Sequence, residues 1–293
     1  MPLRADQRAL GLLLLGAVAI GLAPIFVRLA DVGYTAAAFW RLLLAIPPLW
    51  WLARRESRRD ARPAPWRLWL LAGLFFALDL GAWHQSIRLT TVANATLLAN
   101  LAPVFVALGA FLLFGERSDR GFLVGLAVAL LGAGLLAADS LALSTDRVAG
   151  DALGVLTAVF YAGYLLSVSR ARRVGGALNL MLWTTVISAI ALLPPALLID
   201  GEQFWPQSPR GWAVLAGLAL VSHAGGQGLI AHAMAHLPAA FSSVSLLVQP
   251  VAAALFAWAL LGEAIGSLQA VGAGFVIAGI VVCRRAARPA PAG

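Results

Sequence analysis

The chain of 293 residues is 61% hydrophobic and only 12% charged, whereas soluble domains average roughly 45–50% apolar and about 25% charged residues. This composition indicates a membrane protein. All 21 basic residues are arginine, and the lack of lysine excludes a Walker A phosphate loop and Schiff-base catalysis. Because Cys283 is the single cysteine, a disulfide framework and a cysteine zinc site are excluded as well.

Long apolar runs follow one another along the whole chain. A helix needs about 20 apolar residues to cross a bilayer, and ten runs qualify. They are residues 10–30, 35–53, 68–87, 92–114, 121–138, 152–169, 178–199, 211–234, 239–261 and 267–283. The connections are too short for a soluble domain. The sequence therefore predicts an all-α polytopic membrane protein, embedded in a lipid bilayer by ten transmembrane helices.

The arginines fall mainly on one side of these predicted spans. Sixteen lie on the side of the N-terminus, and the other side holds only Arg28, Arg88, Arg147 and Arg210. Positively charged loops stay in the cytoplasm, so both termini are expected to be cytoplasmic. The net charge of +8 is then explained by membrane orientation, and we expect no nucleic-acid partner.

The fourth and ninth runs share a spaced motif. Pro103 is followed by Gly-Glu at residues 115–116, and Pro250 by Gly-Glu at residues 262–263, an offset of 147. Near the start, Leu10-Gly11 matches Leu153-Gly154 at an offset of 143. Residues 10–138 and 152–284 are therefore interpreted as two five-helix repeats joined by a linker at residues 139–151. Five is odd, so the second repeat must be inverted, which is typical of secondary transporters.

Three of these features together resemble a known family. The ten spans, the paired Pro…Gly-Glu endings and Arg41 after Phe39-Trp40 look like the drug/metabolite transporter superfamily, EamA type. The resemblance implies a transporter, not an enzyme, in the bacterial inner membrane. Length and aromatic content are most similar to bacterial exporters of aromatic and other hydrophobic amino acids, and export is implied by the resemblance alone. One departure is Thr184, which stands where the second repeat would repeat Arg41.

Two charged residues fall inside predicted spans. Arg41 lies about 9 Å and Asp79 about 12 Å from the outer membrane surface, at 1.5 Å per helical residue. A charge there costs about 2.5–3.5 kcal/mol on insertion scales and is a functional candidate. One interpretation is a structural ion pair that neutralises itself. The other is that Asp79 binds a substrate ammonium or a proton, and that Arg41 holds the carboxylate of an amino acid.

Polar and aromatic residues share helical faces on several spans, and lipid tolerates such faces poorly. Taken singly, each face is at least as well explained by hydrogen bonds between helices. Taken together, they predict one central cavity where aromatic rings stack on a solute. The candidate substrate-binding residues are Arg41, Asp79, Trp83, Asn100, Tyr161, Tyr164, His223, Gln227, Ser245 and Gln249.

The two mid-span prolines are candidate hinges. Pro103 removes the helical hydrogen bond to the carbonyl of Ala99, and Pro250 removes the bond to the carbonyl of Leu246. Each break is a site where a helix bends. With no nucleotide-binding motif, a solute or ion gradient must supply the energy, so we expect alternating access between the two repeats.

Other motifs point to packing more than to chemistry. His232 and His236 have metal-like spacing, but no third ligand lies beside them, so neither a metal nor any other cofactor is expected. Small faces on spans five and ten suit close helix packing, either within the chain or in a homodimer. These faces are formed by Gly121, Gly125, Gly132, Gly272 and Gly279.

The two glutamates that follow the glycines are expected to fix tight turns. Arg120, four residues after Glu116, is a candidate partner for it, whereas Glu263 has no such arginine.

The sequence therefore predicts a secondary transporter that exports small hydrophobic or aromatic amino acids and related metabolites. The alternative is a proton-coupled exporter of cationic drugs that uses Asp79 as its acid. An intramembrane enzyme is the rival from another class, but the H-E-x-x-H and G-x-S-x-G motifs are missing.

Overall fold

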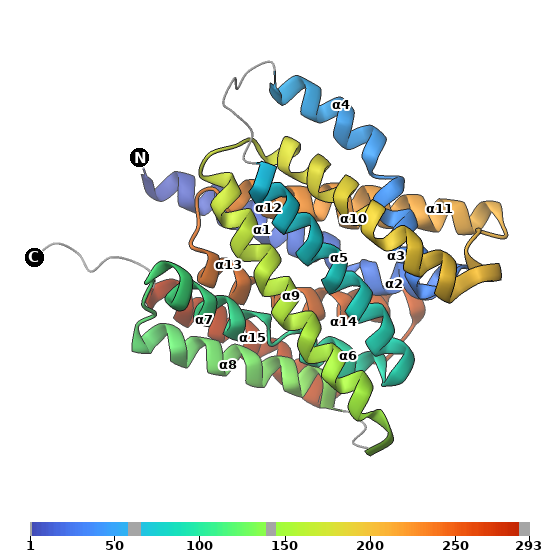
Figure 1. Ribbon diagram of the computed structural model, residues 1–293. Helices are drawn as coiled ribbons and strands as arrows, with labels where there is room; N and C mark the ends of the chain where they lie inside the picture. Colours follow the sequence, from blue (N-terminus) through green and yellow to red (C-terminus); the bar gives the residue numbers. More distant parts are fainter. Residues whose placement is uncertain (1, 58–65, 139–144, 287–293) are drawn as a thin grey trace, which may run out of the picture.

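A computed structural model describes residues 2–57, 66–138 and 145–286, and in this part of the chain every regular element is helical. Figure 1 shows the helices gathered into one bundle. Ten segments are long and apolar enough to cross a membrane. They coincide with the ten predicted spans, and no boundary differs by more than four residues, so the prediction of ten spans is confirmed.

Several spans consist of two helices in sequence. In the first half of the chain the helices are α1 (Pro2–Gly21), α2 (Ala23–Leu29), α3 (Tyr34–Leu43), α4 (Ile46–Ser57), α5 (Trp66–Leu89), α6 (Val92–Ala99), α7 (Ala102–Phe114) and α8 (Arg120–Ala137). In the second half they are η2 (Thr145–Arg147), α9 (Val148–Arg172), α10 (Ala177–Asp200), η3 (Gly201–Gln203), α11 (Pro209–Gly217), η4 (Leu218–Gln227), α12 (Gly228–Ala233), α13 (Ala239–Ser245), α14 (Val248–Leu261) and α15 (Ser267–Ala286).

Some residues on which the sequence predictions depend lie outside the described residues. Residues 58–65 carry three of the arginines counted for orientation, Arg288 is a fourth, and residues 139–144 belong to the predicted linker. The rest of that linker forms the short 3-10 helix η2 and the first turn of α9.

Prolines explain where two-part spans are divided. Pro24 lies in the first turn of α2, Pro103 in that of α7, and Pro250 is the third residue of α14. A proline has no N–H to donate and its ring clashes with the preceding turn, so a helix restarts at it more readily than it continues through it. Spans one, four and nine are therefore divided next to these prolines.

Close glycine contacts join α8 to α15, which lie side by side at the lower edge of Figure 1. A Cβ atom on Gly125 would be 2.8 Å from the Gly279 carbonyl oxygen, and one on Gly132 would be 2.6 Å from that of Gly272. Only glycine permits this backbone approach. Of the two uses expected for these small faces, the structure shows packing within the chain.

Spans two and seven are joined by hydrogen bonds at both of their ends. The Asp200 carboxylate, at the end of α10, accepts a hydrogen bond from the Ala36 N–H in the first turn of α3, with Oδ2 at 2.6 Å. At the opposite end, Glu56 Oε2 of α4 accepts bonds from the Asn179 N–H and Nδ2 of α10, at 2.9 and 3.2 Å. Unpaired N–H groups at a helix start favour such carboxylates. We call these contacts the reciprocal caps.

Glycines make room for both caps. A Cβ atom on Gly33 would lie 2.2 Å from the Asp200 Cγ, and one on Gly176 would lie 2.2 Å from the Glu56 Oε2. Both glycines directly precede the capped helix. Each cap therefore combines a glycine before the helix with a carboxylate from the other span. The cap at Asp200 holds the start of α3, and with it the residues that α3 contributes to the site.

Candidate functional site

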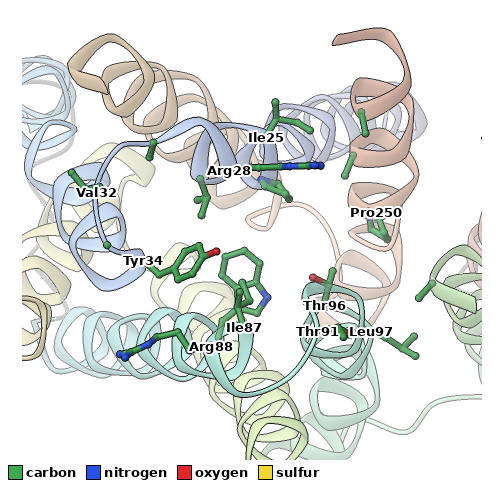
Figure 2. A pocket seen from close by; sticks show the side chains of 18 of the residues that line it. Ile25, Arg28, Val32, Tyr34, Ile87, Arg88, Thr91, Thr96, Leu97 and Pro250 are labelled. Carbon is green, nitrogen blue, oxygen red and sulfur yellow. The ribbon is translucent and has the colours of Figure 1, made fainter. Parts of the chain in front are cut away.

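A large cavity opens at one end of the bundle. Its volume is about 1260 Å³, and Figure 2 shows Tyr34 on one side of it and Thr96 and Pro250 on the other. Exposed residues at the ends of spans one, three and nine form its mouth, among them Arg28, Arg88 and Glu263. We call this cavity the vestibule and this end of the bundle the open end.

A second, smaller chamber continues the vestibule toward the centre of the bundle. Its volume is about 150 Å³. We call it the floor chamber. The residues that line both spaces form the throat between them: Pro24, Trp83, Thr96, Asn100, Pro250 and Ala253. The site is therefore one path with a wide entrance and a narrow end.

The floor chamber contains the two charged residues predicted inside spans. Arg41 of α3 and Asp79 of α5 both line it, with 4% and 7% of their surfaces exposed. In the described part of the chain no hydrogen bond and no ion pair within 4.0 Å joins them. The Arg41 Nε also has no hydrogen-bond partner among these residues. Opposite charges thus face one small space without contact.

Five more predicted site residues line these chambers. Trp83 and Asn100 lie in the throat, and Tyr161, Gln227 and Gln249 lie in the floor chamber. Amide groups can donate and accept hydrogen bonds, and the aromatic rings offer apolar faces. Together with Arg41 and Asp79, these residues can bind a small solute that has both charges and an apolar part.

Three predicted residues lie behind the floor chamber instead of lining it. Tyr164 is buried and its hydroxyl donates to the Gln227 Oε1 at 3.5 Å. The His223 Nε2 is 2.8 Å from the Thr185 Oγ1, and the Ser245 hydroxyl donates to the Phe241 carbonyl at 2.9 Å. Tyr164 and His223 therefore make the hydrogen bonds between helices that were the alternative explanation for each polar face, whereas the Ser245 bond lies within α13.

His223 and Gln227 both lie in an irregular part of span eight. Residues 218–227 form the π-helical segment η4 instead of a regular α-helix. Within this segment the two candidate residues have different surroundings. Gln227 reaches the floor chamber, whereas the His223 ring packs on Phe76 with centroids 5.5 Å apart.

Both candidate hinges lie at real helix breaks. Span four is interrupted between Ala99 and Ala102, and span nine between Ser245 and Val248. The expected free carbonyl of Leu246 is not found, because it accepts a bond from the Gln249 N–H at 2.9 Å. The tight turn at the break supplies this donor. Pro250 lines both chambers, whereas Pro103 is buried and lines neither.

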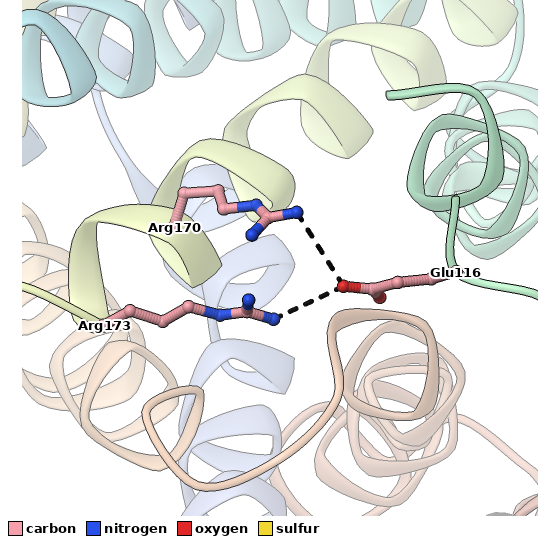
Figure 3. A network of polar contacts seen from close by, with 3 residues as sticks. All are labelled: Glu116, Arg170 and Arg173. Atoms are coloured by element: carbon pink, nitrogen blue, oxygen red, sulfur yellow. Dashed lines mark hydrogen bonds and ion pairs between the residues drawn. The ribbon is translucent and has the colours of Figure 1, made fainter. Parts of the chain in front are cut away.

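At the opposite end of the bundle α7 packs against α13, and we call this end the closed end. Figure 3 shows Glu116 directed between Arg170 of α9 and Arg173, the residue after α9, with its Oε1 at 3.3 Å from the Arg173 Nη2 and 3.9 Å from the Arg170 Nη2. The expectation that Glu116 pairs with Arg120 is therefore wrong, because the end of α9 places its own arginines closer.

Glu263 also has an arginine partner that sequence spacing did not predict. At the mouth of the vestibule it forms an ion pair with Arg28, from the end of α2. Arg28 and Glu263 are 235 residues apart. A helix-spacing rule finds only partners within one turn, and this pair arises from tertiary packing.

Part of the vestibule wall was not anticipated. Tyr34, at the start of α3, and the segment from Asp200 to Gln203 line it, as do Ala133, Leu136 and Ala137 of α8. The cavity-facing residues of α8 are apolar, so a pattern of polar helical faces does not identify them. Helix-end residues such as Tyr34 carry no periodic signal, so only the packing of spans two, five and seven brings them to the cavity.

No metal centre is present among the described residues, since no three His, Cys, Asp or Glu side chains there are grouped to bind one. The rings of His232 and His236 have centroids 6.1 Å apart.

Comparison with known proteins identifies the fold and the family. A model of the EamA-like transporter family matches residues 7–138 and again residues 148–285. A solved crystal structure of a protein aligns with a TM-score of 0.81 at 17% sequence identity, covering 97% of this chain and 100% of that chain. This likeness shows that the fold is shared.

Curated relatives are transporters. An uncharacterized transporter of Archaeoglobus fulgidus is 25% identical, covering 93% of this chain and 95% of the relative. The pseudopaline exporter CntI of Pseudomonas aeruginosa is 26% identical over 74% of each chain. The threonine/homoserine exporter RhtA of Escherichia coli is 29% identical, covering 73% of this chain and 72% of the relative. The chain therefore belongs to the EamA-like transporter family of the drug/metabolite transporter superfamily and is a multi-pass transporter of the inner membrane, not an enzyme.

Proposed function

We propose that the protein exports small hydrophobic or aromatic amino acids and related metabolites by alternating access. The observation that carries this proposal is the floor chamber, where Arg41 and Asp79 face one space without pairing. Buried charges without partners are costly, and an amino-acid zwitterion supplies a partner to both. The exporters of threonine, homoserine and pseudopaline among the relatives agree with this chemistry.

In this proposal each lining residue has a role. Asp79 accepts hydrogen bonds from the substrate ammonium group, and Arg41 donates to its carboxylate. Gln227 and Gln249 complete the polar contacts from the neighbouring spans. Trp83 in the throat offers a ring face to an apolar side chain.

The proposed architecture is a pair of inverted repeats, residues 10–138 and 152–284, with both termini in the cytoplasm. Three structural features support it. Spans four and nine break at equivalent places and end on glycines with φ of 68° and 71°. The reciprocal caps relate Ala36 to Asn179, an offset of 143 that matches the sequence repeat. Arginine is scarce at the open end, so the positive-inside rule places the vestibule on the periplasmic face.

Alternating access follows from unequal packing of the two repeats. Val106 and Ala110 of α7 are buried at the closed end, with 0% and 2% exposure. Their counterparts at the offset of 147, Ala253 and Ala257 of α14, line the open vestibule. If the repeats exchange these arrangements, α14 closes the open end while α7 moves away from the closed end. The site is then reached from each side in turn.

The test is counterflow of labelled amino acids into proteoliposomes that contain the purified protein. We expect uptake of phenylalanine and other hydrophobic amino acids, and loss of at least about tenfold in Asp79→Asn and in Arg41→Gln, since each tenfold step is 1.4 kcal/mol of lost binding. Arg210→Gln is the matched control, because Arg210 is exposed and lines neither chamber. No uptake of any amino acid by the native protein would refute the proposal.

One observation favours a second candidate, a proton-coupled exporter of cationic drugs. Asp79 is the only carboxylate among the residues that line the floor chamber. Arg41→Gln separates the two candidates, because it removes the group that repels a cation. Transport of a cationic dye that is driven by a pH gradient and enhanced in Arg41→Gln, with no amino-acid uptake, would support this second function.

A further inference from the structure

The two chambers differ in which charges remain available to a ligand. In the vestibule, Arg28 pairs with Glu263, Asp200 accepts a backbone hydrogen bond, Arg88 bonds to an amide of its own helix, and Glu202 is exposed at the rim. In the floor chamber, Arg41 and Asp79 form no such bond to each other. The unsatisfied charges of the site therefore lie at its narrow end.

The floor chamber is small. A cavity of about 150 Å³ in another protein binds benzene, so this chamber of about 150 Å³ holds a ligand of similar size. The backbone part of an amino acid, with about five non-hydrogen atoms, is comparable to benzene with about six. An ammonium group, a carboxylate and a bulky side chain together exceed the chamber.

The throat leaves the side chain of a bound amino acid only one direction in which to extend. The floor chamber continues into the vestibule past Trp83, Asn100 and Pro250. Beyond the throat the space widens to about 1260 Å³. Its wall there includes the small apolar residues Ala133 and Ala137 of α8, which leave room for groups of many shapes.

We propose that the site binds amino acids head first, with the free ammonium and carboxylate groups in the floor chamber and the side chain in the vestibule. This inference rests on the proposed amino-acid transport and adds a substrate class to it. Substrates are α-amino acids with both backbone groups unmodified. Side chains can be extended well beyond that of phenylalanine, because the vestibule, at about 1260 Å³, has room for them.

Four labelled probes test the orientation in proteoliposome counterflow: alanine, phenylalanine, O-benzyltyrosine and phenylalaninamide. We expect phenylalanine and O-benzyltyrosine to be taken up within about threefold of each other, and phenylalaninamide at least about tenfold more slowly, since loss of one charge-assisted contact costs more than 1.4 kcal/mol.

Two variants of α14 locate the side chain. Ala253 lines the throat, whereas Ala259 lies on the same helix and is exposed on its outer surface. We expect Ala253→Leu to lower O-benzyltyrosine uptake relative to alanine uptake by about tenfold, and Ala259→Leu to leave that ratio unchanged within about twofold. Ala253→Val is the substitute if the leucine variant does not elute as a folded protein from size-exclusion chromatography.

The outcomes separate this inference from the function on which it rests. If the native protein takes up none of the free amino acids, the proposed function fails. If it takes up alanine and phenylalanine, but accepts phenylalaninamide equally well and rejects O-benzyltyrosine, amino-acid transport stands and the head-first orientation is overturned.

Discussion

The two Gly-Glu corners of the molecule have the same backbone and different surroundings. Gly115 and Gly262 both adopt a left-handed conformation, and the following N–H groups of Glu116 and Glu263 bond to carbonyls six residues back, at 3.1 and 3.3 Å. Such a bond closes a helix end in a standard way. The helix before Glu116 is packed at the closed end, whereas the helix before Glu263 borders the vestibule.

This difference teaches that the local sequence determines the corner and that tertiary packing determines which end of the bundle is open. The arginine partners show the same difference in surroundings. Glu116 pairs with arginines at the end of α9, whereas Glu263 pairs with the arginine at the end of α2. Two equal corners in unequal environments are what a transporter stopped in one of two states would show. If the protein alternates between two states, the surroundings of α7 and α14 should exchange during transport, and substitutions on these helices test this.

The largest effect is expected from a bulky residue on α14. Ala257 lines the vestibule, and its counterpart Ala110 is buried at the closed end. Ala257→Phe should leave the protein folded but abolish counterflow, because the ring blocks closure of the open end. Ala110→Phe should instead lower the melting temperature, since overpacking costs about 1–3 kcal/mol. Native transport rates in Ala257→Phe would show that this face of α14 is never buried.

The hinge prolines should have an intermediate effect. Pro103→Ala and Pro250→Ala together are expected to slow counterflow about tenfold, or about 1.4 kcal/mol in the barrier, with expression unchanged. Pro250→Ala should have the larger share, because Pro250 lines both chambers and Pro103 is buried. The measurement is the initial uptake rate of each single variant and of the double variant. Unchanged rates in the double variant would refute the hinge hypothesis.

The amino-acid sequence is enough to predict the spans, because apolar runs of about 20 residues have few alternatives in a bilayer. It also identifies seven residues that line the cavity, since lipid tolerates polar and aromatic faces within spans poorly: Arg41, Asp79, Trp83, Asn100, Tyr161, Gln227 and Gln249. Tyr164 and Ser245 lie one layer behind that cavity. Periodicity indicates the side of a helix but not its distance from the cavity.

The remaining features depend on contacts between distant segments. No local pattern predicts the π-helical form of span eight or the pairing of Arg28 with Glu263. The same holds for the open and closed ends. The Pro…Gly-Glu motif occurs once in each proposed repeat, so the motif itself cannot specify which end is open.

The smallest effect is expected at the reciprocal caps, which have the same form at both ends. Asp200→Ala and Glu56→Ala each remove a carboxylate from a helix start, a change that costs about 0.5–2 kcal/mol. Because the caps lie at opposite ends of spans two and seven, the two losses should be similar and additive. Melting temperatures in detergent measure them, with Glu202→Ala as the control. A loss at one cap only would show that spans two and seven are held unequally. Equal losses would mean that these spans form a fixed pair, and that the difference between the open and closed ends lies in the divided spans four and nine.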